Sequence, residues 1–154
     1  MATELEWGKA TWYFFHTIIE KVSDDFFMRN KKDIFFMIKN ICYNLQCPEC
    51  CEHAKSYTNS IDLNKIYNKE IFRLEIFNFH NSVNRALEKP LFEYKNLQNY
   101  KNANLNLILN NFLITFRKRY GTLESIGLDS NEISRKKVAK NVELWCFKNW
   151  NNLV

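Results

Sequence analysis

Two sets of residues in this chain have types and spacings that could support chemistry. The first is a pair of cysteines separated by two residues, Cys47 and Cys50. The second lies further along the chain and combines His80 with Asn81 and Asn84. Cysteines at this spacing either exchange disulfides or bind zinc, and amide and imidazole groups bind polar ligands. Together the two sets predict a dithiol redox centre beside a bound ligand, a prediction that neither set supports alone.

The proline that follows Cys47 predicts that a helix begins at this point. Proline is favoured in the first turn of a helix because its missing N–H needs no partner there. Cys47 then caps the helix, and Cys50 lies on the same face and can form a disulfide with it. The neighbouring Cys51 is rotated by about 100° and is the poorer partner. Unpaired N–H groups and the helix dipole favour a thiolate at this end, so we expect ready disulfide exchange.

Zinc binding is the alternative chemistry for this motif. Its ligands would be Cys47, Cys50 and His53, with Cys51 or His80 completing the set. Structural zinc sites usually contain a second cysteine or histidine pair at ligand spacing, and this sequence has no second Cys-x-x-Cys and no His-x-x-x-His. The cysteines alone therefore favour redox chemistry over zinc, with inert thiols as a third alternative.

An apolar stripe with helical spacing predicts that residues 70–87 pack against a core, and polar residues border this stripe. A buried amide without a partner costs about 1 to 3 kcal/mol, so these residues either face water or bind a ligand such as a heteroaromatic ring. Trp12 and His16 share one face of an earlier helix and offer two flat rings, which favours the ligand. The stripe contains Phe72, Ile76, Phe79, Val83 and Leu87, and Phe77, His80, Asn81 and Asn84 run beside it.

Composition and periodicity predict an all-α protein. The 154 residues include only three Gly and two Pro, which leaves few breaks for short strands, and 46% of them are hydrophobic, enough for a core. An Asn-rich stretch predicts a soft boundary, with a first domain of residues 1–102 and a helical C-terminal extension of residues 103–154 that has no catalytic signature. Helices are predicted over residues 8–22 and 33–45, from Pro48 to the polar segment 58–68, over 70–87, 105–120 and about 129–150, with a short element over 92–100.

Charge and hydropathy limit the classes of partner. The net charge of +5 is spread along the chain, and its tight basic cluster is Arg117, Lys118 and Arg119, so we do not expect nucleic-acid binding. No segment approaches the ~20 apolar residues of a membrane span, and the acidic N-terminus does not resemble a signal peptide. We therefore expect an intracellular, cytoplasmic protein without a membrane span. Five cysteines, an odd number, favour catalytic or metal-binding sulfur over a disulfide scaffold.

The order of these motifs resembles the Erv/ALR family of FAD-linked sulfhydryl oxidases over roughly residues 7 to 100. The resemblance implies a four-helix bundle with a short fifth helix, FAD held at its mouth, and a homodimer. The extension of residues 103–154 would be added to this bundle. The motifs are Trp7-Gly8, then Trp12 and His16, then Cys47-Pro48-Glu49-Cys50, then His80-Asn81-Ser82-Val83-Asn84 and Lys89-Pro90.

The resemblance also implies a role for individual residues. Cys50 would be the sulfur nearest the flavin, and Cys47 would exchange with the incoming dithiol. Lys89 would lie near the phosphates of FAD, Tyr100 near its adenine end, and His53 matches a histidine found at this place in several members. The full set implied for FAD binding is Trp7, Gly8, Lys9, Trp12, His16, His53, Phe77, His80, Asn81, Val83, Asn84, Lys89 and Tyr100.

The reaction that the resemblance implies is oxidation of a protein dithiol to a disulfide. Electrons would pass through Cys47 and Cys50 to FAD and then to dioxygen, giving hydrogen peroxide. The implied partners are a protein dithiol substrate, such as a small thioredoxin-like redox protein, and a second copy of the chain; no metal is implied. A zinc-stabilised helical interaction module remains the alternative function, and docking or assembly is a third role open to residues 103–154.

Two departures from the family pattern are informative. Phe77 and Tyr94 stand where many cellular members carry a structural disulfide, and compact viral members also lack that disulfide. Together with the Asn- and Lys-rich composition, this indicates a viral origin, with the host cytoplasm or the virion as the place of action. The second departure is the electron shuttle, because Cys146 lies on a terminal segment without a neighbouring cysteine. A buried or free thiol is the favoured interpretation of Cys146, and Cys42 is expected in the core.

Overall fold

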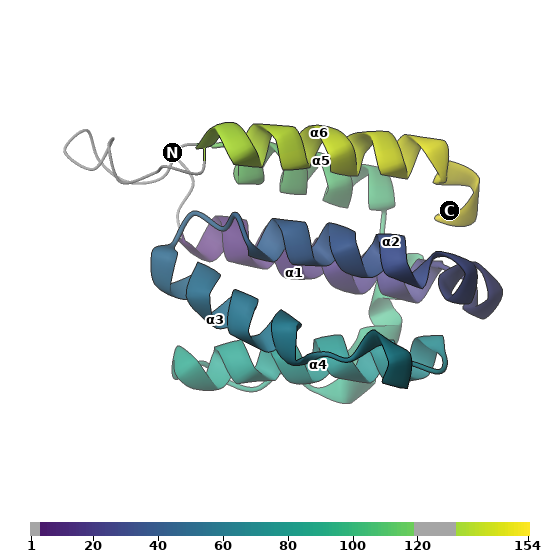
Figure 1. Cartoon of the computed structure of the whole chain (residues 1–154), viewed down its shortest axis with the longest axis horizontal. Coiled ribbons are helices and arrows are strands. Elements are labelled where there is room, and N and C mark those ends of the chain that lie inside the picture. Colours follow the sequence, from purple (N-terminus) through teal and green to yellow (C-terminus); the bar gives the residue numbers. More distant parts are fainter. Residues whose placement is uncertain (1–3, 119–131) are drawn as a thin grey trace.

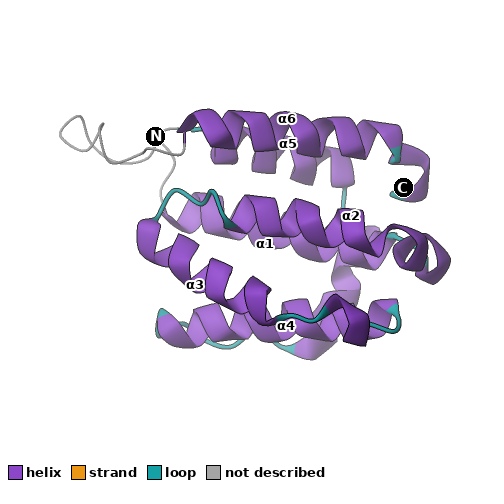
Figure 2. Ribbon diagram, viewed as in Figure 1, coloured by secondary structure: helices purple, strands orange, loops and turns teal. Residues whose placement is uncertain are grey.

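The computed structural model describes residues 4–118 and 132–154, and these ranges consist of helices joined by short loops (Figure 2). No strand occurs in them, which confirms the prediction of an all-α protein. Short 3₁₀ helices lie at Leu63–Lys65 (η1), Tyr94–Asn102 (η2) and Trp150–Asn152 (η4). The α-helices are α1 (Glu4–Lys21), α2 (Asp24–Cys42), α3 (Pro48–Ser60), α4 (Lys69–Ala86), α5 (Leu105–Arg117) and α6 (Glu132–Lys148).

The helices form three layers. Helices α1 and α2 lie side by side in the middle, α5 and α6 cover one side of them, and α3 and α4 cover the other (Figure 1). Phe14 of α1 stacks on Phe112 of α5 with ring centroids 4.7 Å apart, and Phe26 of α2 contacts Trp145 of α6 at 6.2 Å. The buried residues therefore form one core that continues from the bundle into the extension. The boundary predicted near residue 102 stays a prediction.

The second helix begins earlier than the apolar pattern indicated, at Asp24 instead of residue 33. Its start is set by capping, because the hydroxyl of Ser23 accepts a hydrogen bond from the amide of Phe26 at 3.0 Å. Asp24 and Asp25 add negative charge to the first turn, where the helix dipole favours it. Three predicted features lie outside the described residues: the end of the helix over residues 105–120, its terminating Gly121 and the capping residues 129–131 of the last helix.

An aromatic and ionic cluster joins α1, α4 and η2. Phe77 and Tyr94 stand where many cellular Erv/ALR members carry a structural disulfide, and they contact each other edge to face with ring centroids 5.2 Å apart. The guanidinium of Arg73 lies over the Tyr94 ring at 5.0 Å and forms an ion pair with the largely buried Glu20 at 2.6 Å. The hydroxyl of Tyr94 also donates to the carboxylate of Glu70. These contacts attach η2 to α4 without a covalent bond.

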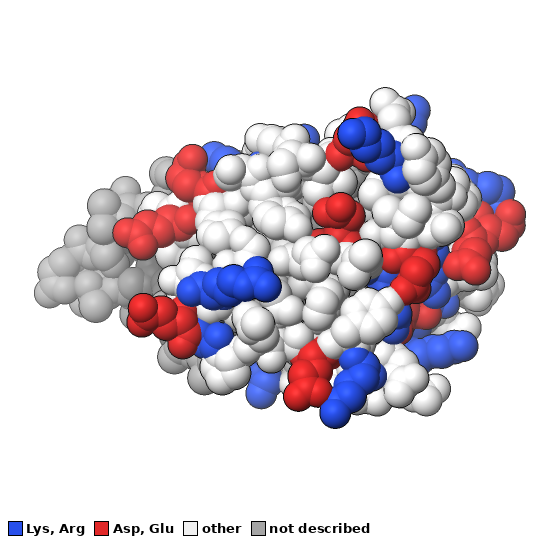
Figure 3. Space-filling view, turned by 90° about the horizontal axis from the view of Figure 1, so that it is seen from below, with Lys and Arg blue, Asp and Glu red and all other residues white. Residues whose placement is uncertain are grey.

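Charged side chains of both signs are interspersed on the face that carries α3 and α4 (Figure 3). No described helix combines the length and the apolar run that crossing a bilayer requires.

Candidate active site

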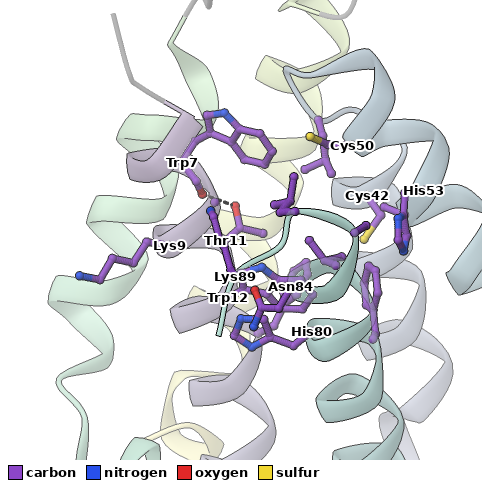
Figure 4. A pocket seen from close by; sticks show the side chains of 18 of the residues that line it. Trp7, Lys9, Thr11, Trp12, Cys42, Cys50, His53, His80, Asn84 and Lys89 are labelled. Atoms are coloured by element: carbon purple, nitrogen blue, oxygen red, sulfur yellow. Dashed lines mark hydrogen bonds between the residues drawn. The ribbon is translucent and has the colours of Figure 1, made fainter. Parts of the chain in front are cut away.

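A cavity of about 780 Å³ opens between α1, α3, α4 and the segment that leads into η2 (Figure 4). Its volume falls within the roughly 300 to 1,000 Å³ of small-molecule and cofactor sites. Both cysteines of the Cys-x-x-Cys pair and most of the predicted cofactor-binding residues line it. These are Cys47, Cys50, Trp7, Gly8, Lys9, Trp12, His53, His80, Val83, Asn84, Lys89 and Tyr100.

The dithiol lies at the start of α3, as the position of Pro48 predicted. Cys47 is the N-cap residue with φ −93° and ψ 119°, and Pro48 occupies the first turn. The Sγ of Cys47 accepts a hydrogen bond from the backbone N–H of Cys50, with a nitrogen to sulfur distance of 3.3 Å. Both cysteines are partly exposed. The pair is therefore placed for exchange with an external thiol while its sulfur is stabilised by a helix-terminal amide.

The other three cysteines are placed differently. Cys51 is buried and its Sγ donates to the carbonyl oxygen of Tyr43 at 3.2 Å, and burial raises the pKa of the Cys51 thiol. Burial also raises the pKa of Cys42, which lies in the core as predicted and contributes to the lining of the cavity. The pKa of Cys146 is raised to about 12 by burial. All three thiols are thus held protonated, and Cys146 is a buried thiol instead of an exposed shuttle.

Two stacked rings form one wall of the cavity. The rings of Trp12 and His80 are nearly parallel, 9° apart, with centroids separated by 4.1 Å. Behind them, Nε2 of His16 lies 2.9 Å from Nδ1 of His80, so one imidazole donates to the other. Burial lowers the pKa of His16 to about 3 with help from His80, and lowers the pKa of His80 to about 4 with help from Lys89. Both rings are therefore neutral near pH 7, which leaves a flat, uncharged wall.

The side chains of the two asparagines of α4 have different contacts. Asn81 forms a pair of hydrogen bonds with the backbone of Phe92, donating to its carbonyl at 3.0 Å and accepting from its N–H at 2.7 Å. Asn84 is also buried, at 9% exposed, and lines the cavity. Its side-chain amide makes no hydrogen bond within residues 4–118 and 132–154. Asn81 therefore positions the segment that closes the cavity, and Asn84 presents an amide to the cavity itself.

Three predicted cofactor-binding residues, His16, Phe77 and Asn81, do not line the cavity. Each is engaged behind the wall: His16 bonds to His80, Phe77 packs on Tyr94 and Asn81 holds the Phe92 backbone. Sequence spacing could not separate them from the lining residues, because His16 shares a helix face with Trp12, and Phe77 and Asn81 lie on the same stripe of α4 as His80 and Asn84. Their contacts are with the protein, and they support the residues that form the cavity surface.

The end of α4 places Lys89 at the cavity. Glu88 adopts a left-handed conformation with φ 55°, which is unfavourable for a residue other than glycine. In this conformation the backbone N–H of Glu88 donates to the carbonyl oxygen of Arg85 at 3.1 Å. The backbone N–H of Lys89 donates to the backbone carbonyl oxygen of Asn84 at 2.8 Å. The two bonds terminate the helix and turn the chain toward Pro90. Lys89 therefore follows a fixed turn instead of an open loop.

Two other predicted residues have partners that fix them. His53 of α3 bonds through Nε2 to the hydroxyl of Ser82 on α4 at 3.0 Å, so it links the helix of the dithiol to the helix of His80. Lys9 lines the cavity, and its ammonium lies over the ring of Tyr13 at 5.7 Å. In Figure 4 the Lys9 side chain extends away from the other labelled residues.

Some lining residues were missed by sequence reasoning. Thr11 and Phe15 follow Trp7 at intervals of four along α1, and this spacing on one face is a signal that could have found them. Phe92 carried no such signal, because it reaches the cavity only through a chain reversal held by Asn81. The residues missed are Thr11, Tyr13, Phe15, Cys42, Leu45, Glu49, Ala54, Phe79, Ala86, Leu87 and Phe92.

The geometry gives the zinc alternative no ligand set. Among the residues that the structure describes, no three His, Cys, Asp or Glu side chains converge as metal ligands do. Cys51 is turned into the core and His53 is bonded to Ser82, so neither joins the Cys-x-x-Cys pair.

The sequence profile of the Erv1/Alr family matches residues 9–103, more than half of the chain. The chain belongs to the Erv1/Alr family. This confirms the resemblance seen in the sequence. The Erv1/Alr match contains the Cys-x-x-Cys pair and all of α4, and it ends before α5.

Individual Erv1/Alr relatives are found in viruses and plants. A protein named FAD-linked sulfhydryl oxidase from African swine fever virus (isolate Tick/Malawi/Lil 20-1/1983) is 36% identical over 128 residues, which cover 80% of this chain and 95% of that protein. The FAD-linked sulfhydryl oxidase of another isolate (Pig/Kenya/KEN-50/1950) is 36% identical over 98 residues, 60% of this chain and 80% of that protein. The FAD-linked sulfhydryl oxidase ERV1 of Arabidopsis thaliana is 30% identical over 90 residues, 58% of this chain and 47% of that protein. A comparison of this chain with solved structures finds no significant match.

Proposed function

We propose that this chain is a FAD-dependent sulfhydryl oxidase that converts a protein dithiol to a disulfide and passes the electrons to dioxygen, giving hydrogen peroxide. One observation carries the proposal: Cys47 and Cys50 open onto the same cavity as the stacked rings of Trp12 and His80. A redox pair and a ring-binding wall in one cavity are what flavin-linked thiol oxidation needs. The names of the Erv1/Alr relatives support the same reaction.

The residues present fit a flavin dinucleotide. The wall of Trp12 and His80 is flat and uncharged, and the side-chain amide of Asn84 lines the cavity without a hydrogen-bond partner among the described residues, so it can bond to a polar group of the ligand. A Cβ at Gly8 would meet nothing within 4 Å, so the helix surface there is open to a close-lying ligand. Lys89 supplies a cation for phosphate groups. When bound, the flavin accepts two electrons from a dithiol and can pass them to dioxygen.

The chain's own residues account for the exchange steps. A substrate thiolate attacks Sγ of Cys47 in the Cys47–Cys50 disulfide, and Cys50 leaves as a thiolate on the cavity side. The second substrate thiol then attacks the substrate sulfur of the mixed disulfide, which releases Cys47 and completes the substrate disulfide. Cys47 is the leaving group in this step, and the N–H of Cys50 donates to its sulfur. The dithiol now holds the two electrons taken from the substrate.

The buried thiols and the neutral histidines keep this exchange selective. Protonated Cys42 and Cys51 are poor nucleophiles, because the thiolate is the form that attacks a disulfide. The neutral imidazoles of His16 and His80 leave the ring wall without a positive charge. Exchange is therefore left to the partly exposed pair Cys47 and Cys50, and the family resemblance assigns the entry of the substrate dithiol to Cys47.

The partner that fits this chemistry is a small protein with an exposed dithiol, such as a thioredoxin-like redox protein. We propose further that the enzyme acts in the cytoplasm of an infected host cell or in the virion, and as a homodimer. The viral relatives support the first statement. Size-exclusion chromatography with light scattering would test the second, because a dimer has twice the mass of the 18.6 kDa chain.

Oxygen consumption with dithiothreitol tests the proposed function. The unmodified protein should consume oxygen, whereas Cys50→Ser should keep its bound flavin and lose turnover, because no thiolate remains to reduce the cofactor. Cys47→Ser should lose exchange with the protein substrate. Cys146→Ser is the matched control and should leave the rate unchanged, because the Cys146 thiol is buried in α6 and does not line the cavity. Full oxygen consumption by Cys50→Ser would contradict the assignment.

A further inference from the structure

The C-terminal extension contacts the residue that immediately precedes Cys47. Gln46 lies in the loop of residues 43–47 between α2 and α3 and is only 7% exposed. Its Nε2 donates to the carbonyl oxygens of Thr115 at 3.0 Å and Phe116 at 3.2 Å. Both carbonyls belong to the last turn of α5, whose end lies on the side of the molecule that carries the α2–α3 loop (Figure 1). The loop before the dithiol is thus attached to a helix outside the family match.

Helix α5 does not depend on these two hydrogen bonds. Carbonyl groups at the end of a helix lack partners within it. The carbonyl of Thr115 also accepts from the amide of Lys118 at 3.3 Å, and that of Phe116 accepts from Nε of Arg135 at 3.1 Å. Each carbonyl would therefore keep a donor if the Gln46 amide were removed. The two hydrogen bonds therefore mainly fix the loop that contains Gln46.

A glutamine at position 46 is also less favourable for the stability of the fold than an apolar residue would be. Its Oε1 is buried and accepts no hydrogen bond within the part of the chain that the structure describes. An unpaired buried acceptor is unfavourable, and an apolar side chain of similar length would avoid it. What the glutamine adds is the pair of donors directed at α5.

The loop of residues 43–47, which contacts both the cavity and α5, determines the position of Cys47. The side chain of Leu45 lines the cavity, whereas that of Gln46 faces α5, so successive residues fix the loop from both sides. Cys47 follows directly and adopts the extended N-cap conformation in which its sulfur accepts the N–H of Cys50. A shift of the loop would move the cysteine out of this position.

We propose that Gln46 is a positioning residue for the redox pair, through which α5 of the C-terminal extension holds Cys47 in its capping position. The proposal rests on the proposed oxidase function only in taking Cys47 as the exchanging cysteine. It gives residues 103–154 an intramolecular role, which is to fix the geometry of the dithiol from outside the bundle.

Alkylation of Cys47 tests the proposal without any flavin chemistry. In a Cys50→Ser background the backbone N–H at position 50 is retained and Cys47 is the remaining thiol of the pair. Gln46→Met removes both donors and keeps the length of the side chain. We expect its rate of reaction with iodoacetamide at neutral pH to fall about 2- to 10-fold, as loss of one hydrogen bond to the sulfur implies. We also expect the pH profile of the reaction to move to higher pH while the melting temperature is nearly unchanged.

The same substitution at the exposed Gln98, Gln98→Met, is the matched control and should change neither the rate nor the profile. If Gln46→Met does not fold, Gln46→Asn decides, because its shorter side chain cannot reach α5 and should give the same shift. A folded Gln46→Met protein with the parent rate and the parent pH profile would overturn the proposal. Failure to retain FAD or to consume oxygen would overturn the proposed oxidase function instead, since alkylation requires neither.

Discussion

The two faces of α1 are built in different ways. The face toward α5 is apolar and closely packed: Phe14 and Phe112 are both fully buried and stack at 4.7 Å. The face toward α4 carries Gly8, Trp12 and His16, and it leaves a cavity of about 780 Å³. One helix thus has one closely packed side and one side that opens onto a cavity. This contrast is what a ligand-binding site needs, because groups arranged for a cofactor are poorly satisfied by the protein alone.

The largest effect on stability should come from the packed face. Phe112→Ala removes a fully buried ring between α1 and α5, and we expect it to lower the free energy of unfolding by about 3 to 5 kcal/mol. Leu107→Ala on the same helix is the control: Leu107 is 58% exposed, so a change within about 0.5 kcal/mol is expected. Urea denaturation measures both. Equal stability of the two variants would contradict the division between the faces.

Low pH should destabilise the protein through His16 and His80 on the cavity side of α1 and α4. The folded pKa values of His16 and His80, about 3 and about 4, lie below the ~6.5 of an unfolded histidine, so the unfolded chain binds protons that the folded chain does not. Stability is complete above pH ~6.5 and is lost as the pH falls toward the folded values, by up to roughly 1.4 kcal/mol per pH unit for each ring. Melting temperatures measured over a pH series test this. The double variant His16→Gln, His80→Gln should have a much smaller slope, and an unchanged slope would refute the assignment.

The two asparagines of α4 allow a direct comparison within the cavity face. Asn81→Leu removes two hydrogen bonds to Phe92 and should lower stability by about 1 to 3 kcal/mol. Asn84→Leu removes an amide without a protein partner, so the cofactor-free protein should be equally stable or more so. Its affinity for FAD should fall about tenfold, or roughly 1.4 kcal/mol. Denaturation and flavin titration of both variants test the pair, and equal destabilisation by both would mean that Asn84 serves the fold.

The smallest effect is expected at Gly8. A glycine inside a helix is less favourable than alanine by about 0.5 to 1 kcal/mol, and nothing in the protein occupies the space of a Cβ there. Gly8→Ala should therefore stabilise the cofactor-free protein and weaken FAD binding. Ala10→Gly in the same helix is the reverse control and should destabilise the protein by a similar amount without affecting FAD. Unchanged FAD affinity in the Gly8→Ala protein would show that FAD does not lie close to the backbone at Gly8.

Local signals were enough to predict that the chain is helical and where the redox pair lies, although not every helix boundary. Pro48 alone indicates where α3 begins and makes Cys47 its cap, and the repeat along α4 indicates which face is buried. The different tasks of Asn81 and Asn84 could not be predicted, since both are asparagines on the same stripe. Whether an amide is engaged depends on the chain returning at Phe92, a contact across the fold that leaves no local pattern.

The role of Gln46 had no local signal either, because its acceptors lie almost seventy residues away on α5. The early start of α2 was missed for a different reason. Its first turn is determined by the cap at Ser23 and two aspartates, and the polar run of residues 29–33 separates the buried Phe26 and Phe27 from the apolar spacing on which the prediction rested. Capping residues are therefore a better guide to this boundary than hydrophobic periodicity.

The most direct test of the account is the amount of FAD bound to the purified full-length protein. After expression and gel filtration, the protein should be yellow and should release a stoichiometric amount of FAD on denaturation. Reduction of that flavin by dithiothreitol without oxygen should require Cys50. A colourless protein that takes up no FAD from solution would show that the cavity beside Cys47 and Cys50 serves another ligand, and the proposed oxidase function would be wrong.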